Sequence, residues 1–146
     1  MILSITYFVV LFVDQVSKAL ALSLLPFFSP RPFLGNIIFL TLTRNKGAAF
    51  GMFPAASVLL LILSTSVVLG IFYFSKKIGK LPVLYQIAIA MVIGGASGNL
   101  LDRLTYGVVV DFIDFRIWPV FNFGDSAIVI GGILLGFLLL FSRQWK

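Results

Sequence analysis

Three long windows of this chain contain no charged residue. They cover residues 57–75, 81–101 and 126–142. Each is close to the roughly 20 apolar residues that a helix needs to cross a bilayer. A fourth window, residues 2–25, is long enough to cross but contains Asp14 and Lys18. These windows predict an all-α membrane protein with four transmembrane helices.

The composition supports a membrane protein and narrows its chemistry. The chain is 60% hydrophobic and 11% charged, whereas soluble domains are about 45–50% apolar and about 25% charged. Its 146 residues fit one integral-membrane domain, 1–146. The absence of cysteine excludes disulfides and thiol chemistry. The net charge of +6 is spread along the chain, which favours contact with lipid headgroups over nucleic-acid binding.

The first window has an alternative interpretation as a cleaved signal peptide, with residues 19–21 (ALA) as the cleavage site. Signal peptides carry a basic region before the apolar run. Here no lysine or arginine precedes the run, and Asp14 and Lys18 lie before the supposed cleavage site. We therefore interpret residues 2–25 as a transmembrane helix.

Basic residues near the ends of the spans predict their direction. Lys76, Lys77 and Lys80 fill the short link between the second and third spans, and Arg143 and Lys146 follow the fourth. Both groups lie on the same side of a four-span protein, so we expect that side, with both termini, to be cytoplasmic.

The two outer segments are predicted to carry some structure of their own. Residues 36–43 (NIIFLTLT) are rich in β-branched residues and lack proline and glycine, which is typical of a strand. Residues 108–110 are a candidate second strand, and residues 47–53 are expected to form a turn followed by a short amphipathic piece. The fold prediction is therefore four transmembrane helices with a small outer-face β-sheet.

All acidic residues of the chain are aspartates, and it contains no glutamate and no histidine. Charges within membranes are costly and often functional. At about 1.5 Å per helical residue, Asp14 lies roughly 18 Å along the first span, in the outer half of a core about 30 Å thick. The other acids fall at the outer ends of spans or in the outer loop. All five converge on the outer half of the membrane: Asp14, Asp102, Asp111, Asp114 and Asp125.

Asp14 and Lys18 are four residues apart on one helix, in the favoured acid-first order. They form either a self-neutralising buried pair or a brace for a nearby site. Because a mere pair could be replaced by leucines at little cost, we favour structural support of a site.

The run of residues 94–103 (GGASGNLLDR) combines small and polar side chains. Its small residues predict close packing against another helix. Asn99 and Arg103 share a helix face, and a guanidinium can hold a carboxylate or a carbonyl in a fixed fork. Asp102 is expected to cap the helix end or to pair with a neighbour.

Asp111 and Asp125 are the favoured reacting pair. Asp125 precedes the fourth span, where it could be an N-cap and where the helix dipole favours negative charge. Asp111 follows three valines, and such surroundings favour a protonated acid. A neutral and an ionised carboxyl together can hydrolyse peptides as aspartic proteases do. Asp114 competes with Asp111 for this role, and spacing alone leaves the choice open.

Five blocks of this chain resemble the bacterial lipoprotein signal peptidases, or signal peptidase II. They occur in the family's order and cover nearly the whole chain. The blocks are residues 14–18 (DQVSK), 45–50 (NKGAAF), 95–103 (GASGNLLDR), 109–114 (VVDFID) and 121–126 (FNFGDS).

The resemblance implies a four-helix intramembrane aspartic protease with an outer β-cradle. We expect no cofactor and no metal. The protease's substrate would be a prolipoprotein with a diacylglyceryl-modified cysteine, cut just before that cysteine. Carried over position by position, it makes Asp111 and Asp125 the catalytic pair. The polar residues expected around the site are Asn45, Asn99, Arg103 and Asn122, with Asp14 and Lys18 as support. We expect a monomer in the bacterial cytoplasmic (inner) membrane, with membrane lipids as further partners.

Other functions fit the sequence less well. A small proton-coupled transporter would use Asp14, but transporter sites lie near the midplane, and the loop aspartates would have no task. A purely structural subunit leaves the costly acids unexplained. Without histidine or cysteine, serine–histidine, thiol and HExxH zinc sites are excluded. A Ser17–Lys18 dyad is disfavoured because adjacent helical residues do not face each other.

Overall fold

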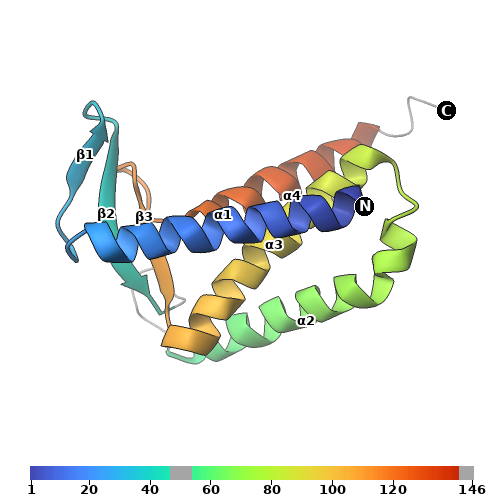
Figure 1. The fold of residues 1–146 in the computed structure, drawn as a ribbon, viewed down its shortest axis with the longest axis horizontal. Helices are drawn as coiled ribbons and strands as arrows, with labels where there is room; N and C mark the ends of the chain where they lie inside the picture. Colours follow the sequence, from blue (N-terminus) through green and yellow to red (C-terminus); the bar gives the residue numbers. More distant parts are fainter. Residues whose placement is uncertain (47–53, 142–146) are drawn as a thin grey trace.

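The computed structural model describes the backbone of residues 1–46 and 54–141, and their side chains except for residues 54–60. Four helices lie side by side: α1 (Ile2–Leu24), α2 (Pro54–Ile78), α3 (Val83–Tyr106) and α4 (Phe123–Phe141) (Figure 1). Each is long and apolar enough to cross a membrane. The chain is therefore a multi-pass membrane protein, as its charge-free windows predict. The expected turn and amphipathic piece at residues 47–53 lie outside the described residues.

Helix α3 is the centre of the bundle and packs against the other three helices. Its glycines allow this close approach, as their sequence predicts. A Cβ atom at Gly95 would collide with the backbone carbonyl of Gly124 in α4, and one at Gly98 would collide with the Asp14 carboxylate of α1. The apolar side chains that point away from α3, such as Phe12 of α1 and Leu140 of α4, are exposed, as expected for a surface that faces lipid.

Helix α3 continues past the predicted end of the third span. The span was expected to stop at residue 101 because Asp102 and Arg103 are charged. Instead the helix runs to Tyr106, and Gly107 ends it in a left-handed conformation (φ 70°). Asp102 is 2% exposed and is held by partners from other elements, so its charge does not end the helix. The prediction that it caps the helix is wrong, whereas pairing with a neighbour is confirmed.

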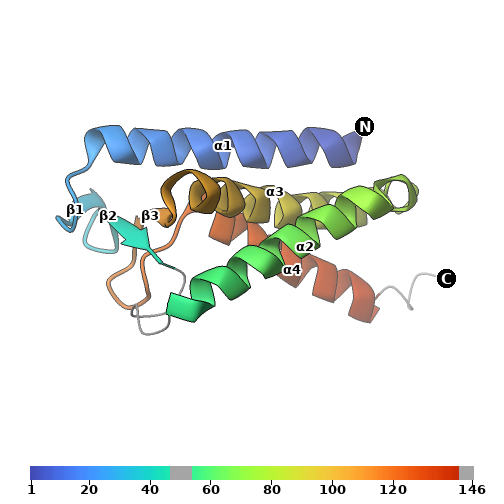
Figure 2. The same ribbon diagram turned by 90° about the horizontal axis from the view of Figure 1, so that it is seen from below.

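A three-stranded antiparallel sheet in the order β1-β2-β3 lies at one end of the bundle (Figures 1 and 2). Its strands are β1 (Arg31–Leu34), β2 (Ile38–Asn45) and β3 (Val109–Asp114). Strand β2 lies two residues later than predicted, and β3 extends beyond the predicted 108–110. Strand β1 was not predicted because it is short, exposed and contains Pro32, a residue confined to sheet edges.

The topology brings the polar blocks of the sequence together. The start of α1 and the end of α4 lie at the end of the bundle away from the sheet, as does the α2–α3 connection (Figure 1). The last turns of α1 and α3 and the first turn of α4 therefore meet next to the sheet. In the register of β2 with β3, Thr43 lies opposite Asp111 and Asn45 opposite Val109. This register places Asn45 next to Asp111.

Candidate active site

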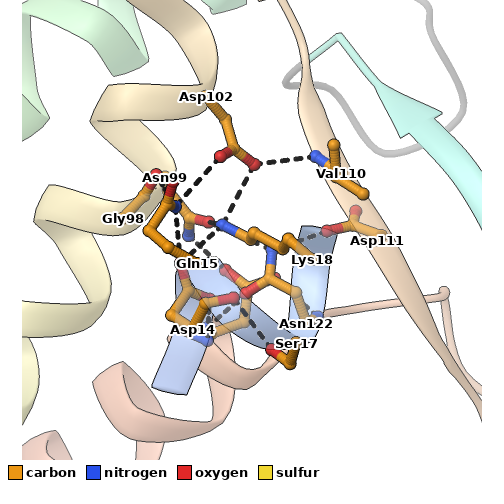
Figure 3. Close-up of polar contacts among 12 residues, drawn as sticks. Asp14, Gln15, Ser17, Lys18, Gly98, Asn99, Asp102, Val110, Asp111 and Asn122 are labelled. Carbon is orange, nitrogen blue, oxygen red and sulfur yellow. Dashed lines mark hydrogen bonds and ion pairs between the residues drawn. The ribbon is translucent and has the colours of Figure 1, made fainter. Parts of the chain in front are cut away.

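Buried polar side chains gather where α1, α3 and α4 meet β3 (Figure 3). Asp14, Asp102, Asp111 and Asn122 are each at most 2% exposed. Every buried side-chain nitrogen and oxygen atom within the described part of the chain has a hydrogen-bond partner. Such complete pairing is needed for polar groups in an apolar setting.

Asn122 and Asp125 cap the start of α4 reciprocally. The Asn122 Oδ1 accepts the backbone N–H of Asp125 at 2.8 Å, and the Asp125 Oδ2 accepts the backbone N–H of Asn122 at 3.4 Å. This is the capping-box arrangement, in which two unpaired N–H groups of a helix start are satisfied at once. The sequence suggested that Asp125 could be the N-cap of α4. In the structure the N-cap is Asn122, and Asp125 lies in the first turn of the helix. The cap holds the Asp125 carboxylate at the positive end of the helix dipole.

Asp111 lies in the middle of β3 and is 1% exposed. Its Oδ2 accepts a hydrogen bond from the Asn45 Nδ2 at 2.8 Å, and its Oδ1 accepts one from the Asn122 Nδ2 at 2.7 Å. Burial, with a smaller contribution from the charge of Asp125, raises the pKa of Asp111 to about 7, although the hydrogen bonds from the two amides and the charge of Lys18 act to lower it. Near neutral pH this carboxyl can therefore either hold or release a proton.

Two asparagines connect Asp111 to Asp125. The Asn99 Nδ2 donates to the Asp125 Oδ1 at 2.7 Å, and the Asn99 Oδ1 accepts the Asn122 Nδ2 at 3.0 Å. Asn122 in turn reaches Asp111. The structure thus brings together both members of the predicted pair and three of their predicted neighbours, Asn45, Asn99 and Asn122.

The predicted Asp14–Lys18 ion pair is present, with 2.8 Å between the Lys18 Nζ and the Asp14 Oδ2. The same Nζ lies 3.0 Å from the Asp102 Oδ2 and donates to the Asn99 Oδ1 at 2.9 Å. The pair is therefore part of the polar centre. Because the Asp14 carboxylate also accepts the Gly124 N–H and is fully buried, it does not suit a proton carrier with access from both sides.

Arg103 lies one turn beyond Asn99 on α3, and its guanidinium donates to the Asn99 carbonyl at 3.4 Å. Its charge also interacts with those of Asp125, Asp111 and Asp102. Arg103 therefore brings positive charge to a site that contains several carboxylates.

Asp114 is engaged elsewhere. Its Oδ2 accepts the Thr41 hydroxyl at 2.6 Å, and its Oδ1 accepts the Arg116 N–H at 2.7 Å. Burial favours a higher pKa for Asp114, but the hydrogen bonds from Thr41 and Arg116 and the Arg116 charge outweigh it and lower the pKa. Asp114 thus fixes the turn after β3, where Arg116 has a left-handed backbone (φ 66°), and it is bonded to neither Asn45 nor Asn122.

Sequence reasoning missed Gln15. Its Nε2 contacts the Asp14 Oδ2, the Asp102 Oδ1 and the Gly98 carbonyl at 3.1–3.2 Å. Its place next to Asp14 in the 14–18 block was a usable signal. However, neutral glutamine in an apolar helix is less conspicuous than a charged residue.

An apolar cavity of about 420 Å³ opens beside Asp125. The turn after β3 contributes Phe115, Trp118 and Phe121 to its wall, and α4 contributes Val129 and Ile130. An extended apolar segment entering from the membrane could therefore come close to the Asp125 carboxylate. Within residues 1–46 and 54–141, no group of three acidic, histidine or cysteine side chains is arranged to hold a metal ion.

Together, fold and site define a multi-pass membrane protein with an aspartate–asparagine centre at one end of a four-helix bundle. Residues 6–141 match the family model of signal peptidase (SPase) II. The chain therefore belongs to the signal peptidase II family, and it is a peptidase.

Similar proteins agree with this assignment. A lipoprotein signal peptidase of Pelotomaculum thermopropionicum is 43% identical, over 96% of this chain and 92% of its own. One of Mycobacterium avium is 40% identical, over 93% of this chain and 77% of its own. A bacterial membrane enzyme structure determined by the in meso method at 2.3 Å resolution superposes with a TM-score of 0.87. It is 30% identical, and the match covers 99% of this chain and 90% of that one.

Proposed function

We propose that this chain, as one integral-membrane peptidase domain, is an aspartic endopeptidase that removes signal peptides from diacylglyceryl-modified prolipoproteins. The cut falls just before the lipidated cysteine. The observation that carries the proposal is the connection of Asp111 to Asp125 through Asn122 and Asn99. The family and the names of the relatives supply the substrate class.

In the proposed mechanism, Asp111 and Asp125 are the catalytic pair. Asp125 takes a proton from a water molecule, whose oxygen attacks the scissile carbonyl carbon. Asp111 gives its proton to the carbonyl oxygen, so a neutral tetrahedral intermediate forms. Its collapse breaks the C–N bond: the amine leaves with the proton from Asp125, and the hydroxyl proton returns to Asp111. A pKa of about 7 suits Asp111 to this exchange.

The other predicted residues would support this chemistry. Asn45 and Asn122 orient the Asp111 carboxyl, and Asn99 orients that of Asp125. Arg103 offsets negative charge, and Asp14 and Lys18 hold α1 against the site. The apolar cavity beside Asp125 would receive the signal peptide, whose hydrophobic segment lies in the same bilayer.

The proposed location is the bacterial cytoplasmic membrane. Lys76, Lys77 and Lys80 near the α2–α3 connection would lie on the cytoplasmic side with both termini. The sheet and the aspartates then face the outer side, where a signal peptide's cleavage point emerges. The proposed enzyme acts as a monomer among membrane lipids.

Mapping the cut by mass spectrometry tests this function. Purified protein in detergent is incubated with a prolipoprotein whose cysteine carries diacylglycerol, and with the same polypeptide without lipid. We expect products only from the lipidated form, with the modified cysteine as the new N-terminus. Asp114→Asn, a carboxylate exchange in the same strand but outside the Asp111–Asp125 connection, should cleave at the same bond. Equal cleavage of the unlipidated form, or a cut elsewhere, would refute the proposed specificity.

A further inference from the structure

The residues immediately before Asp111 and Asp125 are held in the same way. The backbone N–H of Val110 donates to the Asp102 Oδ2 at 3.0 Å. The backbone N–H of Gly124 donates to the Asp14 Oδ1 at 2.7 Å. Hydrogen bonds to ionised acceptors are stronger than neutral ones. Each aspartate of the pair is therefore anchored, through the backbone N–H of the preceding residue, to another buried carboxylate.

One ammonium joins the two anchoring carboxylates. The Lys18 Nζ lies 2.8 Å from the Asp14 Oδ2 and 3.0 Å from the Asp102 Oδ2, so it lies between residues of α1 and α3 (Figure 3). Gln15 makes a second, neutral bridge, because its Nε2 contacts both carboxylates. The backbones of β3 and α4 are thereby connected through Asp102, Lys18 and Asp14.

The third donor of the ammonium fixes the direction of an amide. Lys18 donates to the Asn99 Oδ1 at 2.9 Å, so the Asn99 Nδ2 faces the other way, toward the Asp125 Oδ1. Lysine has three donors, and Asp14, Asp102 and Asn99 use all of them.

The edge of β3 explains why Asp102 is needed. Beyond β3 no further strand accepts the N–H groups on either side of Asp111 within the described sheet. Instead, the N–H of Val110 donates to the Asp102 carboxylate, and the N–H of Phe112 donates to the Phe121 carbonyl at 3.0 Å. Asp102 thus replaces a missing strand partner next to Asp111.

We propose that Asp14, Lys18 and Asp102 form a positioning triad that sets the separation of Asp111 and Asp125. The inference rests on the proposed function, because it takes these two aspartates as the reacting pair. It assigns Asp102 a role that the sequence left open, and it gives the Asp14–Lys18 brace a specific task. Stability alone does not require the triad, since well-packed apolar residues can replace buried ion pairs at little cost.

Three substitutions test the triad: Asp102→Asn, Asp14→Asn and the milder Gln15→Leu, which changes no charge. We expect kcat per folded molecule to fall by about tenfold to a hundredfold in the two aspartate variants, as for displaced catalytic groups. The loss in Gln15→Leu should be smaller but of the same kind. Tyr85→Phe is the matched control, because it removes a hydrogen bond between α3 and α4, from the Tyr85 hydroxyl to the Leu138 carbonyl at 3.0 Å, at the end of the bundle away from the site. It should lower stability without lowering kcat per folded molecule.

A titration independent of activity completes the test. The chain has only five acidic residues, all aspartates, so carboxyl ¹³C-labelled aspartate gives five side-chain NMR signals, and Asp111→Asn identifies that of Asp111. If Asp125 moves away, its charge raises the pKa of Asp111 less, so this pKa should fall in all three variants, including Gln15→Leu. It should not change in Tyr85→Phe.

Two results together would overturn the triad. The pKa of Asp111 would be unchanged in Gln15→Leu and Asp102→Asn, and kcat per folded molecule would be unchanged as well. Should Asp102→Asn fail to fold, Asp14→Asn and Gln15→Leu decide: the first removes a member of the triad, and the second removes the neutral contact between its two carboxylates without a charge change. Failure of the wild-type protein to cleave lipidated substrate would refute the proposed function. In that case the pKa of Asp111 can still be measured by NMR, so the positioning role of the triad is still testable.

Discussion

Asp111 combines complete burial with two amide donors and a carboxylate neighbour. Burial penalises its charge, and Asp125 adds to this effect, so its pKa of about 7 lies well above the roughly 3.9 of an unfolded chain. Its protonated form is therefore favoured by folding. Asp114, three residues away, has the opposite shift because hydrogen bonds and Arg116 favour its charged form. One strand thus holds two aspartates with different proton affinities.

The raised pKa of Asp111 makes stability depend on pH. Its contribution is fully present below about pH 4 and is lost as pH rises through about 7, at a cost of at most about 4 kcal/mol. An asparagine side chain does not ionise, so the Asp111→Asn variant does not lose this stability as pH rises. The melting temperature of Asp111→Asn minus that of the wild type should therefore increase between pH 5 and pH 8 in detergent, whatever its value at pH 5.

Asp114→Asn provides the control for this measurement. The lowered pKa of Asp114 means that its contribution is lost only as pH falls through that pKa, so this variant should show no such increase between pH 5 and 8. A pH-independent melting-temperature difference for Asp111→Asn would show that Asp111 is not held as described.

The sequence predicted the partners of some site residues but not of others. Asp14 and Lys18 could be paired from sequence because helical spacing alone puts them together. Asp102 could not be understood in this way, because its partners come from α1 and from the backbone of β3. Asn122 was expected near the site only from the family's motif, and its role as the N-cap depends on where α4 begins.

At the scale of elements, the helices were largely predictable, because charge-free apolar windows of sufficient length mark transmembrane helices. The end of α3 was not, since its terminal charges are paired only in the folded protein. The sheet was predicted in part: β2 has a β-branched pattern, whereas β1 is short and contains Pro32. Local sequence cannot show that β2 supports β1.

The elements at the two ends of the bundle allow a test of orientation. The chain lacks cysteine, so single cysteines can be placed at Arg31 in β1 or at Lys80 in the α2–α3 connection, both exposed. In intact spheroplasts, a membrane-impermeant thiol reagent should label Arg31→Cys but not Lys80→Cys. After lysis it should label both. The reverse pattern in intact cells would invert the proposed topology.

At the scale of the whole molecule, the fold places a polar centre in a setting that is otherwise apolar. Three helices and two strands each supply part of it, and glycines in α3 let the helices approach closely. The cavity beside Asp125 is walled by the turn that Asp114 fixes. The convergence of the aspartates was predictable from helix length and direction, but their connection through Asn99 and Asn122 required the structure.

The most direct test of the central claim is the cleavage rate of Asp111→Asn, Asp125→Asn and the double variant on lipidated substrate, corrected for folded protein. If the two carboxyls act as one unit, each single variant should lose at least about a thousandfold in rate, and the double variant should be no slower than either. Substantial cleavage by either folded single variant, or multiplicative losses in the double variant, would contradict a shared catalytic pair.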